Sequence, residues 1–250
     1  MSRVPEAGSI TPADSSPVFA TSPVFATSLD VATSMDVATS MDVATSLGHA
    51  RLHLTGPAAG PVLALGHGAG GGVEASDLQA VASAAAQAGW RVVLVEQPWR
   101  VAGRRVAAPP AHLDRGWQEA LAVLPAPVVV AGGRSAGARV ACRTADALGV
   151  HGLLLLAFPL HPPGRPERSR ADELSGLSVP ALAVQGERDP FGTPAEVAQA
   201  CPSAQVVPVV DADHALRVPK RSASAGLPGA LDDVMAFLGA IPGGATRGNA

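Results

Sequence analysis

The sequence predicts an α/β fold in which helices cover both faces of a doubly wound, mostly parallel sheet. From Ala50 onward, short apolar runs rich in Val, Leu and Ala alternate with segments of helical periodicity, which is the order expected of right-handed βαβ units. Aromatic residues make up only 3% of the 250 residues and Tyr is absent, so the core must be built from aliphatic side chains. A sheet buried on both faces suits such a core. At this length we expect one domain.

Each element of this fold has a local signal. Strands are expected where a short apolar run is bounded by Gly, Pro or polar residues, with an alternating edge strand first: 51–55, 61–65, 91–95, 128–130, 152–156, 181–185 and 205–210. Helices are expected where apolar residues recur at three- and four-residue spacing: 76–88, 114–124, 136–148, 194–201 and 229–238. The connection between 157 and 181 is short and is broken by Pro159, Pro162, Pro163 and Pro166, so no large helical lid is predicted.

The first 47 residues differ from the rest. Residues 17 to 46 repeat nearly every six residues, as in Met-Asp-Val-Ala-Thr-Ser. A period of six matches neither a helix nor a heptad, and about five copies are too few to stack into a buried solenoid core. We therefore predict a disordered tail over 1–47, a globular domain over 48–241 and a disordered C-terminal tail over 242–250. A binding role for the repeat is the alternative to a tract without function.

Charge and cysteine content narrow the class of protein. The formal net charge of −3 provides no basic surface for nucleic acid or an anionic membrane. No signal peptide and no apolar run of membrane-spanning length is visible. Cys142 and Cys201 show no metal-ligand spacing. We expect a cytoplasmic protein, monomeric or homodimeric, that uses no metal or other cofactor and has a small molecule as its partner.

The most informative stretch is Gly133-Arg134-Ser135-Ala136-Gly137, a G-x-S-x-G motif. The apolar run 128–130 leads into it as a strand, and a periodic segment ending at Gly149 leads out of it as a helix. At a sharp strand-to-helix turn the serine is held in a strained backbone, and only glycine fits on either side. The sequence therefore predicts Ser135 as a catalytic nucleophile. A chance match in a structural loop is the alternative.

A serine nucleophile needs a base and an acid that orients the base. On sheets of this kind the chain order is serine, then acid, then histidine. Asp189 follows one late strand and His214 follows the last, so we predict them as acid and base. Glu187 and Asp213 are rivals for the acid. Other histidines are less favoured by their position in the chain order or in the predicted elements: His53, His67, His112, His151 and His161.

The glycine loop 66–72 follows an early strand and is predicted to support the reaction. The backbone N–H groups of Ala69 and Ala136 are the expected oxyanion donors, and His67, Gly68 and Gly70 are expected to contact substrate. A phosphate-binding loop is the alternative, but the sequence lacks the Gly-Lys-Ser/Thr ending and a suitable G-x-G-x-x-G pattern.

A basic mouth is also predicted for this site. Arg134 precedes the serine, and Lys220 and Arg221 follow the histidine, so we assign all three to substrate binding and expect a substrate with a negative charge near its scissile bond. The alternative is ordinary surface charge, because 17 of the 18 basic residues are Arg. Further arginines follow the strand at 91–95: Arg100, Arg104 and Arg105.

Five stretches together resemble a known group. They are 66–70 (Gly-His-Gly-Ala-Gly), 132–139, 158–168, 184–194 and 213–221, and they are similar to the small α/β-hydrolase proteins related to dienelactone hydrolase, in particular the subgroup that includes testis-expressed protein 30. The resemblance implies the α/β-hydrolase fold and a triad of Ser135, Asp189 and His214. Dienelactone hydrolases place cysteine at the nucleophile, so serine here argues against lactone chemistry.

From residues and resemblance together we expect a serine hydrolase that cleaves a small ester, thioester or amide through an acyl-enzyme. Some larger relatives of the subgroup look like non-catalytic parts of assemblies, so an inactive protein-binding module is the second hypothesis. Retention of serine, aspartate and histidine favours the enzyme.

Overall fold

The structure is a computed structural model that describes residues 39–244. The disorder predicted for residues 1–38 and 245–250 lies outside the described residues.

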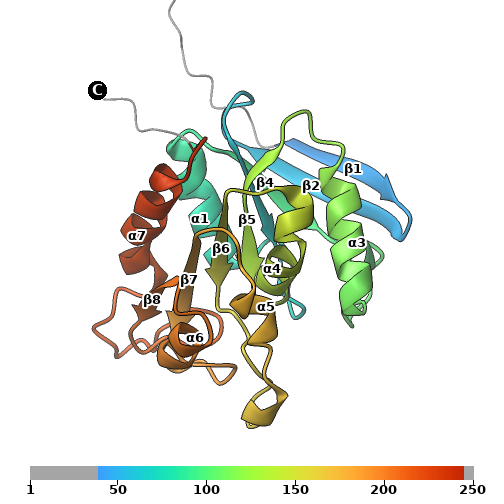
Figure 1. Cartoon of the computed structure of the whole chain (residues 1–250). Helices are drawn as coiled ribbons and strands as arrows, with labels where there is room; N and C mark the ends of the chain where they lie inside the picture. Colours follow the sequence, from blue (N-terminus) through green and yellow to red (C-terminus); the bar gives the residue numbers. More distant parts are fainter. Residues whose placement is uncertain (1–38, 245–250) are drawn as a thin grey trace, which may run out of the picture. The chain divides into compact units, whose positions relative to one another are not determined.

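One eight-stranded sheet runs through residues 39–244 in the order β1-β2-β4-β3-β5-β6-β7-β8 (Figure 1). β1 and β2 form an antiparallel hairpin, and β2 pairs antiparallel with β4. The remaining strands are parallel to their neighbours, so the predicted α/β fold with a mostly parallel sheet is confirmed. The strands are β1 Thr39–Thr45, β2 Gly48–Thr55, β3 Val62–Gly66, β4 Arg91–Glu96, β5 Val128–Arg134, β6 Gly152–Leu156, β7 Ala181–Gly186 and β8 Gln205–Val209.

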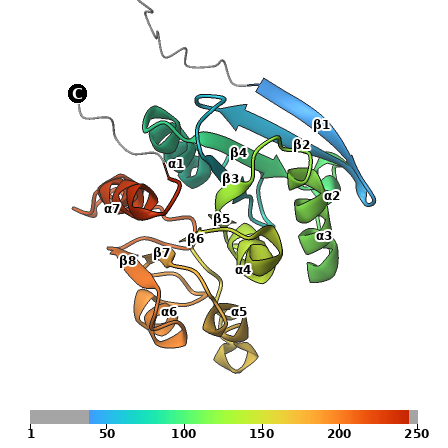
Figure 2. The same ribbon diagram turned by 45° about the horizontal axis from the view of Figure 1, so that its top comes forward.

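Helices cover both faces of this sheet (Figure 2), because side chains of a buried strand alternate between its faces. α1 and α7 bury Leu78 and Val234 in one apolar cluster, and the opposite cluster includes Trp117 of α3 and Val140 of α4. The helices are α1 Ser76–Gln87, α2 Pro98–Val101, α3 Pro110–Leu121, α4 Ala136–Leu148, α5 Asp172–Ser175, α6 Pro194–Ala200 and α7 Leu227–Ala240, with a 3₁₀ turn at Pro166–Arg168. In the described part of the chain, no helix is apolar and long enough to cross a membrane.

The predicted disordered tail is wrong at its C-terminal end, because Thr39–Thr45 form β1. Val43 is only 4% exposed, Arg51 pairs with Asp42 at 2.6 Å, and the Ser46 hydroxyl donates to Glu119 of α3 at 2.8 Å. Six is a multiple of the two-residue strand period, so the last repeat can keep one face inward once β2 offers a free edge. The repeat pattern alone contains no sign of that edge.

Other boundaries differ less. The sequence missed the four-residue helix α2, and α3 begins at Pro110 rather than at 114. At the other end of the domain, the Pro242 carbonyl contacts His151 Nδ1 at 2.8 Å, so the ordered part extends past residue 241. The connection from β6 to β7 holds only a 3₁₀ turn and α5. The absence of a large lid is therefore confirmed.

Candidate active site

Ser135 lies at the turn from β5 into α4 with a strained backbone, φ 53° and ψ −111°. The two glycines of its motif explain how the turn fits. A Cβ at Gly133 would lie 2.3 Å from the carbonyl oxygen of Gly66 at the end of β3, and a Cβ at Gly137 would lie 2.2 Å from the same atom. The turn is thus pressed against β3, and its strain presents the serine side chain at the carboxyl edge of the sheet, where ligands of such sheets bind.

His214 joins Ser135 to Asp189 in one chain of contacts. His214 Nδ1 lies 2.8 Å from Asp189 Oδ2, and its Nε2 lies 3.0 Å from Ser135 Oγ. A carboxylate can only accept, so the proton sits on Nδ1 and leaves Nε2 free to accept the serine proton. Phe191 packs on the imidazole with ring centroids 4.2 Å apart. The Asp189 side chain is fully buried, whereas that of His214 is 19% exposed.

Gln185 is a part of this network that sequence reasoning missed. Its side chain lies at the end of β7, fully buried, and its Nε2 donates to Asp189 Oδ2 at 3.0 Å and to the Gly192 carbonyl at 2.7 Å. Its Oε1 accepts from the Phe158 N–H at 2.8 Å. The amide therefore fixes the acid between two loops. The sequence did contain a signal for this role: Gln185 is the single polar side chain in the apolar run Ala-Leu-Ala-Val-Gln. An amide buried in such a strand needs hydrogen-bond partners.

The rivals of Asp189 serve the loops instead. Glu187 Oε2 accepts from the Asp211 N–H at 3.3 Å, and Asp213 Oδ1 accepts from the Ala215 N–H at 2.8 Å. Among the other histidines, His161 approaches Glu196 at 3.5 Å. In the described range 39–244, Asp189 is therefore the carboxylate in contact with the histidine that reaches the serine.

The glycine loop lies against the nucleophile. A Cβ at Gly68 would be 3.4 Å from Ser135 Cβ, so the backbone after β3 closely approaches the serine. Ala136 is the first residue of α4, and the first N–H groups of a helix have no acceptor within it. Ala69 is exposed, while a Cβ at Gly70 would meet nothing within 4 Å. The predicted oxyanion donors are thus on the two segments that flank Ser135.

A family model described as an alpha/beta hydrolase domain matches residues 59–237. The chain belongs to the α/β-hydrolase family. Solved structures share its fold: a serine hydrolase without a lid from Xanthomonas campestris is 22% identical with a TM-score of 0.62, covering 82% of this chain and 97% of its own. An α/β serine hydrolase homologue from Coxiella burnetii is 17% identical with a TM-score of 0.60, and the match covers 80% of this chain and 94% of that one. A carboxylesterase from Bacillus subtilis is 14% identical with a TM-score of 0.58, and the match covers 81% of this chain and 92% of that one. Comparison with curated proteins gives no match.

In this α/β-hydrolase, the His67 side chain is buried and hydrogen-bonded within the protein, so its predicted contact with substrate remains a prediction. The residue is 3% exposed. Its Nε2 accepts from the Gln97 N–H at 3.1 Å and its Nδ1 donates to the Gly68 carbonyl at 2.9 Å. Burial lowers the pKa of the imidazole, which therefore stays neutral. His67 instead ties the glycine loop to the start of α2.

The charge of Arg134 is already paired within the protein. Its Nε lies 2.6 Å from Asp77 Oδ2, with side chains 14% and 3% exposed, and its Nη2 donates to the His214 carbonyl at 3.1 Å. A Cβ at Gly68 would lie 2.9 Å from its Nη1. Arg134 thus joins α1, the histidine loop and the glycine loop. Its role in a basic mouth therefore remains a prediction that the Asp77 ion pair does not favour.

The other two cations predicted for the mouth are not brought to the triad. Lys220 and Arg221 are exposed in the turn after the histidine loop. Within the described residues, neither side chain makes a hydrogen bond or an ion pair with Ser135, Asp189 or His214. The substrate-binding role of these two side chains therefore remains a prediction without structural support.

Proposed function

We propose that this protein is a serine hydrolase that cleaves a small ester, thioester or amide through an acyl-enzyme. The observation that carries the proposal is the unbroken chain of contacts from Ser135 Oγ through His214 to Asp189. Ser135 acts as nucleophile, His214 as general base and acid, and Asp189 as the group that holds the His214 tautomer. The strained serine backbone supports the same proposal, because such strain is typical of functional sites.

The reaction follows from this geometry. His214 Nε2 takes the proton from Ser135 Oγ as the oxygen attacks the carbonyl carbon, and the carbonyl oxygen becomes an oxyanion. The N–H groups of Ala136 and Ala69 are proposed to donate to that oxyanion. Each donor should lower the activation free energy by roughly 3 kcal/mol. The imidazolium then protonates the leaving group as its bond to carbon breaks. Water, deprotonated by His214, then attacks the acyl carbon. The bond from this carbon to Ser135 Oγ breaks, the carboxylic acid leaves, and His214 returns the proton to Ser135 Oγ.

Short acyl groups fit the open site best. The β6 to β7 connection is too short to form a cover, and it is fastened to α4 by Arg139 Nε and Glu173 Oε2 at 2.7 Å. Among residues 39–244, no closing element then shields a long apolar chain. The proposal also places the chain in the subgroup that includes testis-expressed protein 30. Serine in place of cysteine at the nucleophile argues against lactone chemistry.

A cytoplasmic location is a further part of the proposal. The free thiols of Cys142 and Cys201 support it.

Labelling with a fluorophosphonate, followed by turnover of p-nitrophenyl esters of rising chain length, tests the function. Wild-type protein should label once and hydrolyse acetate and butyrate esters, while Ser135→Ala should lose both properties and keep its melting temperature. Ser83→Ala, at an exposed position of α1, is the matched control and should behave as wild type. Wild-type turnover by Ser135→Ala would contradict the proposal and would favour a protein-binding module.

A further inference from the structure

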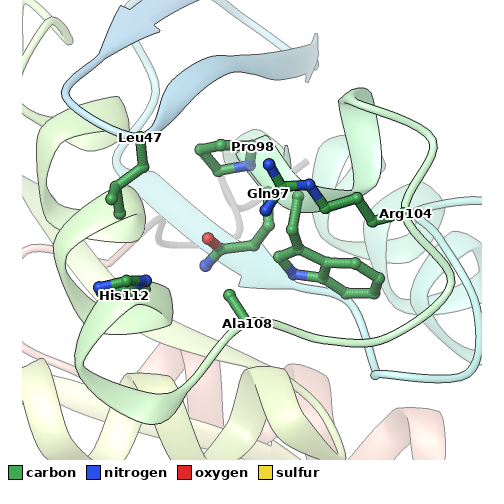
Figure 3. Close-up of a pocket in the computed structure, with 7 residues that line it drawn as sticks. Leu47, Gln97, Pro98, Arg104, Ala108 and His112 are labelled. Carbon is green, nitrogen blue, oxygen red and sulfur yellow. The ribbon is translucent and has the colours of Figure 1, made fainter.

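Two neighbouring cavities lie beside the elbow, where the chain leaves β4. The smaller, of about 10 Å³, is bounded by His67, Trp117 and Ala136 among others, and the larger, of about 50 Å³, by Leu47, Arg104 and His112 (Figure 3). Gln97 and Trp99 line both. A cavity of about 10 Å³ holds at most one water, whereas about 50 Å³ is room for a group of a few heavy atoms. The larger cavity is therefore the one that can receive a ligand.

Both shared residues present polar atoms that have no partner. Gln97 and Trp99 are each 5% exposed, and Gln97 Oε1 and Trp99 Nε1 make no hydrogen bond to any residue in the described part of the chain. The orientation of the Gln97 amide is fixed, because its Nε2 donates to the Leu113 carbonyl at 3.1 Å. Two residues that line the cavity thus each carry one unused polar atom, an acceptor on Gln97 and a donor on Trp99. Buried polar atoms are rarely left so unless a ligand or water completes them.

A cation stands at the rim of the same cavity. Arg104 extends over it from the loop after α2, and the Gln97 side chain extends towards His112 on α3 (Figure 3). In residues 39–244, Arg104 has no ion-pair partner, whereas Arg100 lies 3.7 Å from Glu74. An anion is the natural complement of an unpaired guanidinium. The indole N–H of Trp99 offers the same ligand a second donor.

We propose that this cavity binds a small hydroxycarboxylate group. The carboxylate would accept from Arg104 and the Trp99 N–H, and the hydroxyl would donate to Gln97 Oε1. Each unpartnered atom then gains a partner of the right kind. A plain carboxylate offers no donor to Gln97 Oε1, and a neutral amide offers donor and acceptor but leaves the charge of Arg104 without a counter-charge. The group is either a free acid or the end of a substrate, and the binding itself does not depend on the proposed hydrolysis.

Titration of Ser135→Ala protein with glycolate, acetate and glycolamide tests the site, with the indole N–H resonances as the readout. Glycolate should shift the Trp99 resonance, assigned through Trp99→Phe, and leave that of Trp90, which packs on the other face of the sheet, in place. Acetate lacks the hydroxyl and glycolamide the charge, so each should bind at least about fivefold more weakly. No shift of the Trp99 resonance by glycolate would overturn the proposal and leave water as the occupant.

Arg104→Gln provides the second arm, with Arg105→Gln as its matched control, since Arg105 is an exposed neighbour that does not line the cavity. Glycolate affinity should fall about fivefold in the first variant and less than about twofold in the second. Equal losses in both would overturn the proposal. Competitive inhibition of wild-type ester hydrolysis by glycolate would identify the group as the end of a substrate. Binding without competition would identify it as a separate ligand, and either result supports the site.

Discussion

Two buried polar networks at the carboxyl edge of the sheet differ in completeness. Around Asp189, both carboxylate oxygens and both ends of the Gln185 amide have partners. Around α2, Gln97 Oε1, Trp99 Nε1 and Trp117 Nε1 are buried without hydrogen-bond partners among residues 39–244. A complete network holds its members in one arrangement, while an incomplete one is satisfied only when something binds. The first is suited to fixed catalytic geometry, and the second to ligand recognition.

The largest effect is expected from breaking the complete network at its centre. Asp189→Asn should leave the fold intact but lower kcat by about 10⁴-fold, because the amide no longer holds the His214 tautomer. Steady-state hydrolysis of a p-nitrophenyl ester measures the loss. Glu187→Gln, in the same loop but away from the histidine, is the control and should change kcat less than about twofold. A comparable loss in Glu187→Gln would move the acid to the rival position.

Arg134 tests how the complete network is attached to the rest of the molecule. Arg134→Gln leaves the buried carboxylate of Asp77 without its cation, and the loss of one member of such a pair costs about 3 kcal/mol of unfolding free energy. Denaturant unfolding measures it. Asp77→Asn and the double variant complete a cycle, in which the double loss should be clearly smaller than the sum of the single losses. Additive losses would show that the contact contributes little.

How much was predictable depends on whether the signal was local. Ser135, Asp189 and His214 each follow a strand, so the motif, the position after a strand and the chain order together selected three residues that the structure brings into contact. Gln97 and Trp99 line a cavity together with residues of α3 and of the β1–β2 turn. The sequence next to Gln97 and Trp99 contains no signal that these distant segments lie beside them. The same reasoning applies to Arg134. The charge of Arg134 looked available because Asp77, its partner, lies 57 positions earlier in the chain.

A smaller effect is expected at Gln185. Gln185→Met retains the volume of the side chain but removes the donor to Asp189 and the acceptor for Phe158, so the acid is less firmly oriented. We expect kcat to fall about tenfold to a hundredfold with KM little changed, and the free energy of unfolding to fall by about 1–3 kcal/mol. Gln185→Glu offers no N–H to Asp189 when ionised and should not rescue kcat. A lower stability with unchanged kcat would reduce Gln185 to a packing residue.

The smallest effect concerns His67, which borders the incomplete network. Burial, the largest cause, lowers its pKa in the folded state, and the nearby Glu96 and Glu74 oppose this only in part. Below the unfolded pKa of about 6.5, the unfolded chain takes up a proton that the folded protein does not. The free energy of unfolding therefore falls as the pH drops from 6.5 towards the folded pKa, by up to about 1.4 kcal/mol per pH unit from this group. Above 6.5 the contribution is constant. Denaturant midpoints at pH 7.5 and 5.5 should differ less in His67→Gln than in wild type. An unchanged pH dependence in His67→Gln would show that this imidazole takes up its proton as readily folded as unfolded.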